Sequence, residues 1–128
     1  GVIEYLGTTS DVRPAIAAAS CVVLPSYREG APRTLIEAAA MARPLIATDV
    51  PGCRAVIDRD ISGFLCEVRS AENLAAAFRR FIALPIEARR AMAAAGRAKM
   101  EREYSQVLVV AAYRAALGLV TGQGSSGR

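Results

Sequence analysis

Short apolar runs that alternate with helix-forming segments constrain the fold of this chain more than any other feature. The clearest run is residues 21–24 (CVVL), which is closed by Pro25. A strand that is apolar on both faces is typical of a parallel sheet covered by helices on both sides. Residues 2–6, 45–47 and 64–68 form further short runs, so we expect them to be strands of the same sheet.

Segments rich in strong helix formers separate and follow these runs. Helices are expected at residues 12–19, 32–42, 71–84, 86–103 and 105–119. Ser70 can cap the helix that follows it. Residues 54–57 are short and ambiguous. The order predicts an α/β fold, a Rossmann-like parallel sheet flanked by helices, whose ligands bind in the loops after the strands, here after Leu6, Leu24, Ala47 and Ile57.

Composition supports one domain of this class. The 128 residues suit a single domain at residues 1–120, and the Gly/Ser-rich residues 121–128 are expected to be a disordered tail. The chain is 53% hydrophobic but only 5% aromatic, which favours helices on a sheet and excludes intrinsic disorder. No apolar run approaches the roughly 20 residues needed to span a membrane.

Cysteine and histidine content limits the available chemistry. Cys21, Cys53 and Cys66 are an odd, irregularly spaced set, which is a poor disulfide framework and indicates reduced, mostly buried thiols in a cytoplasmic protein. Cys53 lies in a turn-like stretch and is expected to be more exposed. The chain has no histidine and no cluster of carboxylates or thiolates, so no metal site is expected.

The net charge of +4 comes almost entirely from arginine. The arginines are scattered and no aromatic residues interleave with them, so a nucleic-acid partner is not indicated. The pairs at 79–80 and 89–90 are interpreted as solvated helix faces, and Asp49 as a turn-forming residue. A role of the two arginine pairs at an anionic membrane is kept as an alternative.

One stretch combines several features of an anion site. Residues 25–38 (PSYREGAPRTLIEA) follow a buried strand and open a helix, whose first N–H groups are unpaired. Gly30 allows close approach of the backbone to a ligand, and Arg28 and Arg33 add positive charge. Glu29 and Glu37 flank this site, and carboxylates there suit the hydroxyls of a sugar and a ribose. The stretch therefore points to a nucleotide-sugar.

This stretch and several others, in the same order, resemble the retaining glycosyltransferases of family 4 and their GT-B relatives. The resemblance lies in the two glutamates eight positions apart, together with residues 5–7 (YLG), 11–24, 43–52 (RPLIATDVPG) and 62–65 (SGFL). It covers about residues 1 to 115. It implies that the chain is part of the C-terminal, nucleotide-sugar-binding domain of a GT-B fold.

The resemblance also implies roles for individual residues. Glu29 would bind hydroxyls of the donor sugar near its reactive face and is the candidate catalytic residue. The other candidate donor-binding residues are Gly30, Ala31, Arg33, Thr34, Leu35 and Glu37, with backbone N–H groups of Thr34 and Leu35 on the distal phosphate and Glu37 on the ribose. Leu6 and Gly7 would help to frame the base. The implied reaction retains the anomeric configuration and needs neither a metal nor a cofactor.

Several expectations about the whole protein follow from the resemblance. The family's diphosphate-clamping residues lie in the first strands of this domain, and its acceptor site in an N-terminal domain, and neither part is found in this sequence. The chain alone is therefore expected to be inactive. The parent is expected to be a hexosyltransferase in the cytoplasm or at the inner face of the membrane, with a bacterial-type polysaccharide or glycolipid as acceptor.

Two alternatives stay open from the sequence. The chain could be a non-catalytic nucleotide-sugar-binding domain that self-associates, for example as a homodimer that covers an exposed sheet edge. It could also be a GT-B relative that epimerises nucleotide-sugars.

Overall fold

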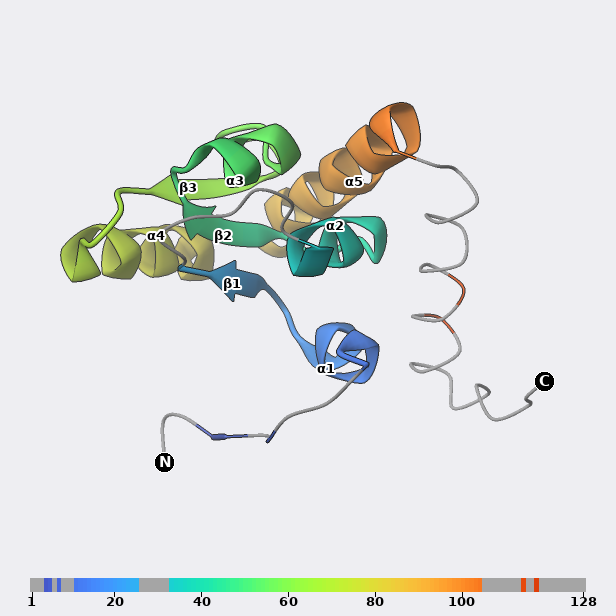
Figure 1. The fold of residues 1–128 in the computed structure, drawn as a ribbon, viewed down its shortest axis with the longest axis horizontal. Helices are drawn as coiled ribbons and strands as arrows, with labels where there is room; N and C mark the ends of the chain where they lie inside the picture. The colour runs from blue at the N-terminus through green and yellow to red at the C-terminus, as the bar shows by residue number, and fades with distance from the viewer. Residues whose placement is uncertain are drawn as a thin grey trace.

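The computed structural model of the chain describes residues 4, 5, 7, 11–25, 33–104, 114 and 117. A three-stranded parallel sheet lies at its centre (Figure 1). Its strands β1 (Val22–Leu24), β2 (Leu45–Thr48) and β3 (Gly63–Cys66) are adjacent in sequence order. Leu45 is the partner of Val22 on one side and of Gly63 on the other. The predicted α/β class with a parallel sheet flanked by helices is confirmed.

Five helices accompany the sheet in the described ranges: α1 (Arg13–Ala18), α2 (Arg33–Ala40), α3 (Pro51–Val56), α4 (Ala71–Ala83) and α5 (Ile86–Glu103). Four of them were predicted to within a few residues. Ser70 caps α4 as predicted, because its hydroxyl accepts a hydrogen bond from the N–H of Asn73 at 2.9 Å. The predicted strand at 2–6, the helix at 105–119 and the tail at 121–128 lie wholly or mostly outside the described residues.

Residues 54–57, which are ambiguous in the sequence, do not form a strand: residues 54–56 belong to helix α3, and Ile57 follows it. Pro51 takes the first helical position, where its missing N–H costs nothing. Cys53 and Val56, three positions apart, are buried, whereas Arg54 and Ala55 between them are exposed. This is the burial period of a helix and not of a strand. Cys53 is also fully buried, so its predicted exposure is wrong.

Two apolar cores lie on opposite faces of the sheet, because successive strand residues point to opposite faces. Leu45 and Ala47 of β2 belong to a core with the inner sides of α2 and α3. Ile46, the residue between them, belongs to the other core, with Phe64 and Phe81. Helix α5 connects the two cores: its first half adds Met92 to the second, and its last turn adds Met100 to the first.

Two arginines of the predicted surface pairs stack on aromatic rings of the second core. Arg80 stacks over the ring of Phe64 at 4.3 Å and pairs with Asp60 at 3.2 Å. Arg89 stacks over the ring of Phe81 at 4.7 Å. The interpretation as solvated faces fits Arg80, whose side chain is 56% exposed, but not Arg89, which is partly buried and covers an aromatic ring with its flat guanidinium group.

Arg43 holds the carboxyl ends of two helices. Its Nε donates to the carbonyl of Ile16 at 3.1 Å and its Nη2 to that of Ala17 at 2.8 Å, both in the last turns of α1. Its Nη1 donates to the carbonyls of Met41 and Ala42, which follow α2, at 3.3 Å. One guanidinium thus satisfies carbonyls that the ends of helices leave unpaired.

Candidate donor site

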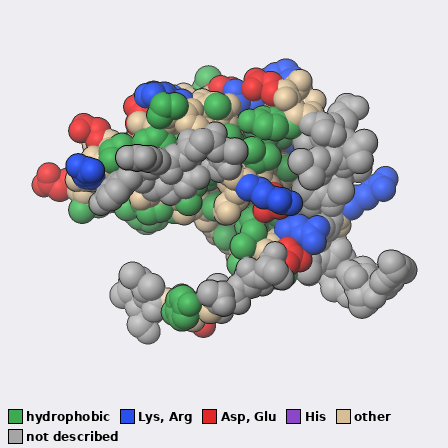
Figure 2. All heavy atoms as spheres, viewed as in Figure 1, with side chains coloured by type: hydrophobic (Ala, Val, Ile, Leu, Met, Phe, Trp, Pro, Cys, Tyr) green, Lys and Arg blue, Asp and Glu red, His purple; other side chains and the backbone are tan. Residues whose placement is uncertain are grey.

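A pocket of about 300 Å³ lies where the start of α1 meets the start of α2, and its lining residues are Asp11, Val12, Arg33, Thr34 and Glu37. Helix α2 follows β1, so its first turn lies on the side of the carboxyl ends of the strands, where open parallel sheets bind ligands. Figure 2 shows basic and acidic side chains next to one another over this region. Of the five lining residues, Arg33, Thr34 and Glu37 were predicted to belong to the donor site.

The first turn of α2 combines an anchored core side chain with open backbone donors. Leu35 is fully buried and packs in the first core, so it fixes the helix against the sheet. Thr34 is half-buried beside it and faces the pocket. The N–H groups of the first turn have no partner within a helix, and they carry the positive end of the helix dipole. The turn can therefore bind an oxyanion such as a phosphate.

Glu37 supplies the carboxylate of the pocket. Its side chain is 23% exposed, and its Oε2 lies 3.5 Å from Nε of Arg33, one turn earlier, whose side chain is 85% exposed. An exposed pair of this length adds little to stability. The carboxylate therefore keeps capacity to accept hydrogen bonds from hydroxyls of a ligand.

Asp11 and Val12 line the opposite wall, which was not predicted to be part of the site, and Arg13 holds the carboxylate of Asp11. Asp11 accepts hydrogen bonds from Nε of Arg13 at 2.9 Å and from Nη2 at 3.1 Å. These bonds lower the pKa of the Asp11 carboxyl and raise the pKa of Arg13, with a small contribution from Glu37 to the latter. In the sequence, Asp11 stood out only as the first residue of the segment 11–24, and its position opposite α2 depends on the packing of α1.

The structure does not bring all predicted site residues together. Glu29, Gly30, Ala31 and Leu6 lie outside the described residues. Gly7 is described and has a φ of +87°, a backbone conformation that favours glycine, with open space around its Cα. Arg33, Thr34 and Glu37 share the pocket, and Leu35 supports it from the core.

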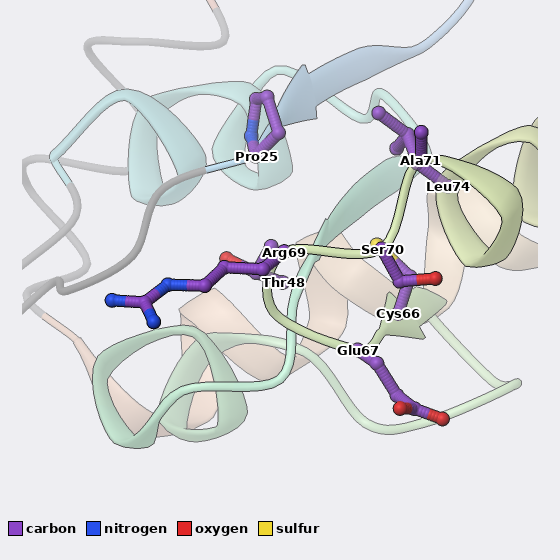
Figure 3. Close-up of a pocket in the computed structure, with 8 residues that line it drawn as sticks. All are labelled: Pro25, Thr48, Cys66, Glu67, Arg69, Ser70, Ala71 and Leu74. Carbon is purple, nitrogen blue, oxygen red and sulfur yellow. The ribbon is translucent and has the colours of Figure 1, made fainter.

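A second cavity, of about 390 Å³, lies along the same edge of the sheet (Figure 3). Thr48 and Cys66, the last residues of β2 and β3, form its floor, and Ser70 and Leu74 of the α4 region form one side. Arg69 projects along it from a backbone with a φ of +61°. The carboxyl edge therefore has two hollows. Pro25 lines one of them, and Arg33 lines the other.

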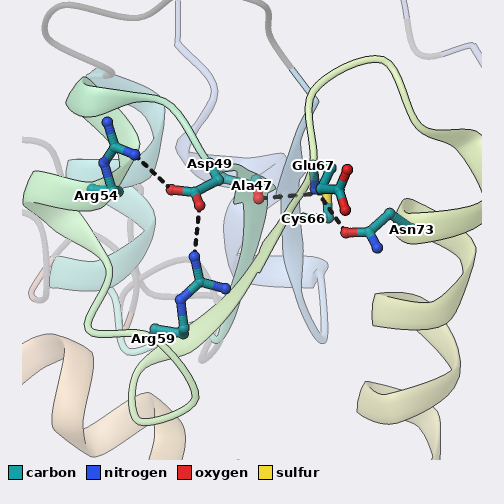
Figure 4. A network of polar contacts seen from close by, with 7 residues as sticks. All are labelled: Ala47, Asp49, Arg54, Arg59, Cys66, Glu67 and Asn73. Carbon is teal, nitrogen blue, oxygen red and sulfur yellow. Dashed lines mark hydrogen bonds and ion pairs between the residues drawn. The ribbon is translucent and has the colours of Figure 1, made fainter.

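Asp49, which follows β2, is held by two arginines and is not a simple turn residue (Figure 4). Its carboxylate accepts from Nη1 of Arg54 at 3.2 Å and from Nη2 of Arg59 at 2.6 Å. The loop after β2 is thereby fixed to α3 and to the turn before β3. Charge spacing in the sequence could not reveal this pairing, because Asp49 and Arg59 are ten positions apart.

The described part of the chain contains neither a metal-binding cluster nor a helix that could span a membrane. No group of three or more Cys, Asp or Glu side chains there could hold a metal ion. No helix there combines the length and the apolar character that crossing a membrane requires.

Comparison with known proteins identifies the scaffold. Residues 1–83 match the model of the family described as glycosyl transferases group 1. The N,N'-diacetylbacillosaminyl-diphospho-undecaprenol alpha-1,3-N-acetylgalactosaminyltransferase of Campylobacter jejuni is 32% identical over 74 residues, which is 58% of this chain and 20% of that enzyme. The chain thus spans about a fifth of the length of the curated relatives that it matches.

Solved structures agree with this assignment. Anabaena Alr3699/HepE, crystallised with UDP and glucose, superimposes with a TM-score of 0.74 at 20% identity, over 93% of this chain and 32% of that one. The C-terminal domain of a group 1 glycosyltransferase (LpcC) from Francisella tularensis gives a TM-score of 0.68 at 24% identity, over 80% of this chain and 52% of that one. The fold is that of the C-terminal domain of GT-B glycosyltransferases, and the chain belongs to the family of glycosyl transferases group 1.

Proposed function

We propose that this chain forms the donor-binding part of a retaining glycosyltransferase that moves a sugar from a nucleotide diphosphate-sugar to a polysaccharide or glycolipid acceptor. The observation that supports this most directly is the pocket at the start of α2, where Thr34 and Glu37 lie together on a group 1 scaffold. The UDP and glucose bound to the related fold of Alr3699/HepE support a ligand of this class.

In this proposal each part of a nucleotide-sugar has its own partner. The N–H groups of Thr34 and Leu35 hold the distal phosphate, with Arg33 as an adjacent charge, and the carboxylate of Glu37 accepts from the two ribose hydroxyls. Glu29 acts at the donor sugar as the catalytic residue, together with the backbone of Gly30 and Ala31, and Leu6 and Gly7 frame the base. The site uses no metal and no cofactor, because the diphosphate is held by backbone donors and arginine.

Further proposals concern the longer protein of which this chain would be a part. We propose a hexosyltransferase whose N-terminal domain supplies the acceptor site, so that the chain alone is inactive. The undecaprenol named in the Campylobacter relative supports a glycolipid acceptor. Three free cysteines support a reducing, cytoplasmic compartment. Contact with the inner face of the membrane is supported by the exposed apolar side chains of Phe78, Ile82 and Ile86.

Nucleotide binding by the chain tests the donor site. Amide resonances of the ¹⁵N-labelled chain are followed during titration with UDP, GDP and ADP, and the Glu37→Ala variant is titrated in the same way. Loss of the charge-assisted hydrogen bonds to the ribose is expected to weaken binding about 10- to 100-fold. The shifts should be centred on Thr34 and Leu35.

Glu101→Ala is the matched control. Glu101 also pairs with an arginine four positions earlier, Arg97, at 3.2 Å, but it lies on α5. Equal weakening in both variants, or binding of the nucleotide without any change at Thr34 and Leu35, would contradict the assignment of the donor site to α2.

A further inference from the structure

A third hollow lies at the opposite, amino edge of the sheet and has an unusual charge. Its volume is about 220 Å³, and its polar lining consists of Ser20, Arg43, Arg89 and Arg90, with Ile86 at its side. The remaining lining residues are alanines and a proline, so none of the lining residues is acidic. Three guanidinium groups thus surround one small space without a carboxylate among them.

Arg89 carries a donor that this part of the protein does not satisfy. Its Nη2 donates to the carbonyl of Ile82 at 2.9 Å, and its guanidinium stacks on Phe81. Its Nε, however, is buried and has no hydrogen-bond partner within the described residues. Leaving a buried donor unpaired destabilises the folded state, and the cost is greater when the donor is charged. This Nε is closed off from solvent, so a ligand in the hollow would bind Arg89 through Nη1, which donates to no residue in the described part of the chain.

The start of α5 points to the same kind of partner. This 18-residue helix begins at Ile86, and its N-cap residue, Pro85, provides no side-chain hydrogen bond. The N–H groups of Ala88 and Arg89 bond to the carbonyl of Pro85, which leaves those of Ile86 and Glu87 for another acceptor. A long helix with an uncapped start favours negative charge at that start.

The other arginines can take part. Arg90 is exposed, and no ion pair joins it to Glu87 or to any other residue that the structure describes. Arg43 uses its Nε, its Nη1 and one bond of Nη2 for helix carbonyls, so one N–H of Nη2 is left. Glu87, in the first turn of α5, is exposed and does not line the hollow.

We propose that this hollow binds a phosphate group, with Arg89, Arg90 and the first N–H groups of α5 as its donors and Ser20 and Arg43 at its sides. Tetrahedral oxyanions accept several charge-assisted hydrogen bonds at once, which is what three guanidinium groups and a helix start offer. The site shares no lining residue with the donor pocket, so it is independent of donor binding, and only its lipid source rests on the membrane contact proposed above. The phosphate has two sources: free phosphate, or the headgroup of a phospholipid, because Ile82 and Ile86 are exposed beside the hollow.

Two arms of one experiment separate the sources. In the first, the ¹⁵N-labelled chain is titrated with inorganic phosphate at constant ionic strength. Saturable shifts of the Ile86 and Glu87 amides, with a dissociation constant below about 1 mM, would support a site for free phosphate. In the second, the chain is sedimented with phosphatidylglycerol vesicles and with phosphatidylcholine vesicles. Binding to the first alone would support a lipid headgroup.

Variants assign either result to this hollow. Arg90→Gln removes one exposed guanidinium and is expected to weaken binding about tenfold in the arm that responds. Arg79→Gln removes an exposed arginine of α4 that does not line the hollow, and it is expected to change binding less than twofold in the phosphate arm. Shifts confined to Thr34 and Leu35, no binding in either arm, or equal weakening by both variants would overturn the proposal.

Discussion

Gly63 stands where any side chain would collide with the main chain of the neighbouring strand. A Cβ at this position would overlap the carbonyl oxygen of Leu45, its partner in β2, and would lie 3.1 Å from the carbonyl carbon. The obstacle is backbone in the middle of the sheet and not the end of a flexible side chain. Gly63→Ala therefore has to push β2 and β3 apart at the point where both are fully buried.

The loss of stability in Gly63→Ala depends on how far the backbone of the two strands can shift to make room for the methyl group. Overpacking of a core costs about 1 to 3 kcal/mol, and the rigid obstacle here puts Gly63→Ala at about 3 kcal/mol. That is a large part of the roughly 5 to 15 kcal/mol that stabilises a domain. With an unfolding entropy of about 2.1 cal/mol/K per residue, this would lower the melting temperature of the 128-residue chain by about 11 °C.

Gly96→Ala makes the same chemical change with the opposite expected sign. A Cβ at Gly96, in the middle of α5, would lie 3.6 Å from Cβ of Ser62 and 3.8 Å from Cβ of Ala39, which are ordinary contacts. Replacing a helical glycine by alanine stabilises by about 0.5 to 1 kcal/mol. Urea unfolding followed by far-ultraviolet circular dichroism measures both variants. Equal stabilities of the two variants would refute the reasoning from local space.

Two further predictions concern titrating groups. Burial disfavours the charged form of Lys99, but hydrogen bonds to Asp58 at 3.0 Å and Glu103 at 3.2 Å outweigh it and raise the pKa of Lys99 above its ordinary 10.5. The resulting stability is complete below the ordinary pKa and is lost as the pH rises through the raised one, so the unfolding free energy should fall more steeply above pH 10.5 in the wild-type chain than in Lys99→Met. Burial also raises the pKa of Cys21 to about 11, against a smaller opposing effect of Arg89. The rate at which iodoacetamide alkylates Cys21, followed by mass spectrometry, should therefore still increase about tenfold per pH unit above the ordinary thiol pKa of about 8.5. A rate that levels off near pH 8.5 would contradict this.

The sequence predicted those parts of the fold that local patterns determine. Residues 21–24 and 45–47 are apolar on both faces, and they are the adjacent parallel strands β1 and β2. Pro51–Val56 was missed because a six-residue helix is too short for its period to stand out beside the apolar residues that follow it. A helix this short depends on tertiary packing, here the burial of Cys53 and Val56.

The candidate site was only partly predictable for a similar reason. Arg33, Thr34 and Glu37 lie within one turn and a half of one helix, so their meeting follows from helical spacing. Asp11 comes from a separate segment, and only the packing of α1 on α2 places it opposite Glu37. The guanidinium of Arg89 and its unpaired Nε depend on the contact between α4 and the start of α5, which no local pattern encodes.

The contacts of Arg43 at the amino edge of the sheet affect the pocket at the carboxyl edge. Helices α1 and α2 start at the two walls of the donor pocket and end at the single guanidinium of Arg43. With six and eight residues, they extend about 9 and 12 Å. A helix of this length is a stiff rod, so a shift of its end is transmitted to its start. The width of the pocket between the two helix starts is therefore set from the opposite end, by Arg43, which does not line the pocket.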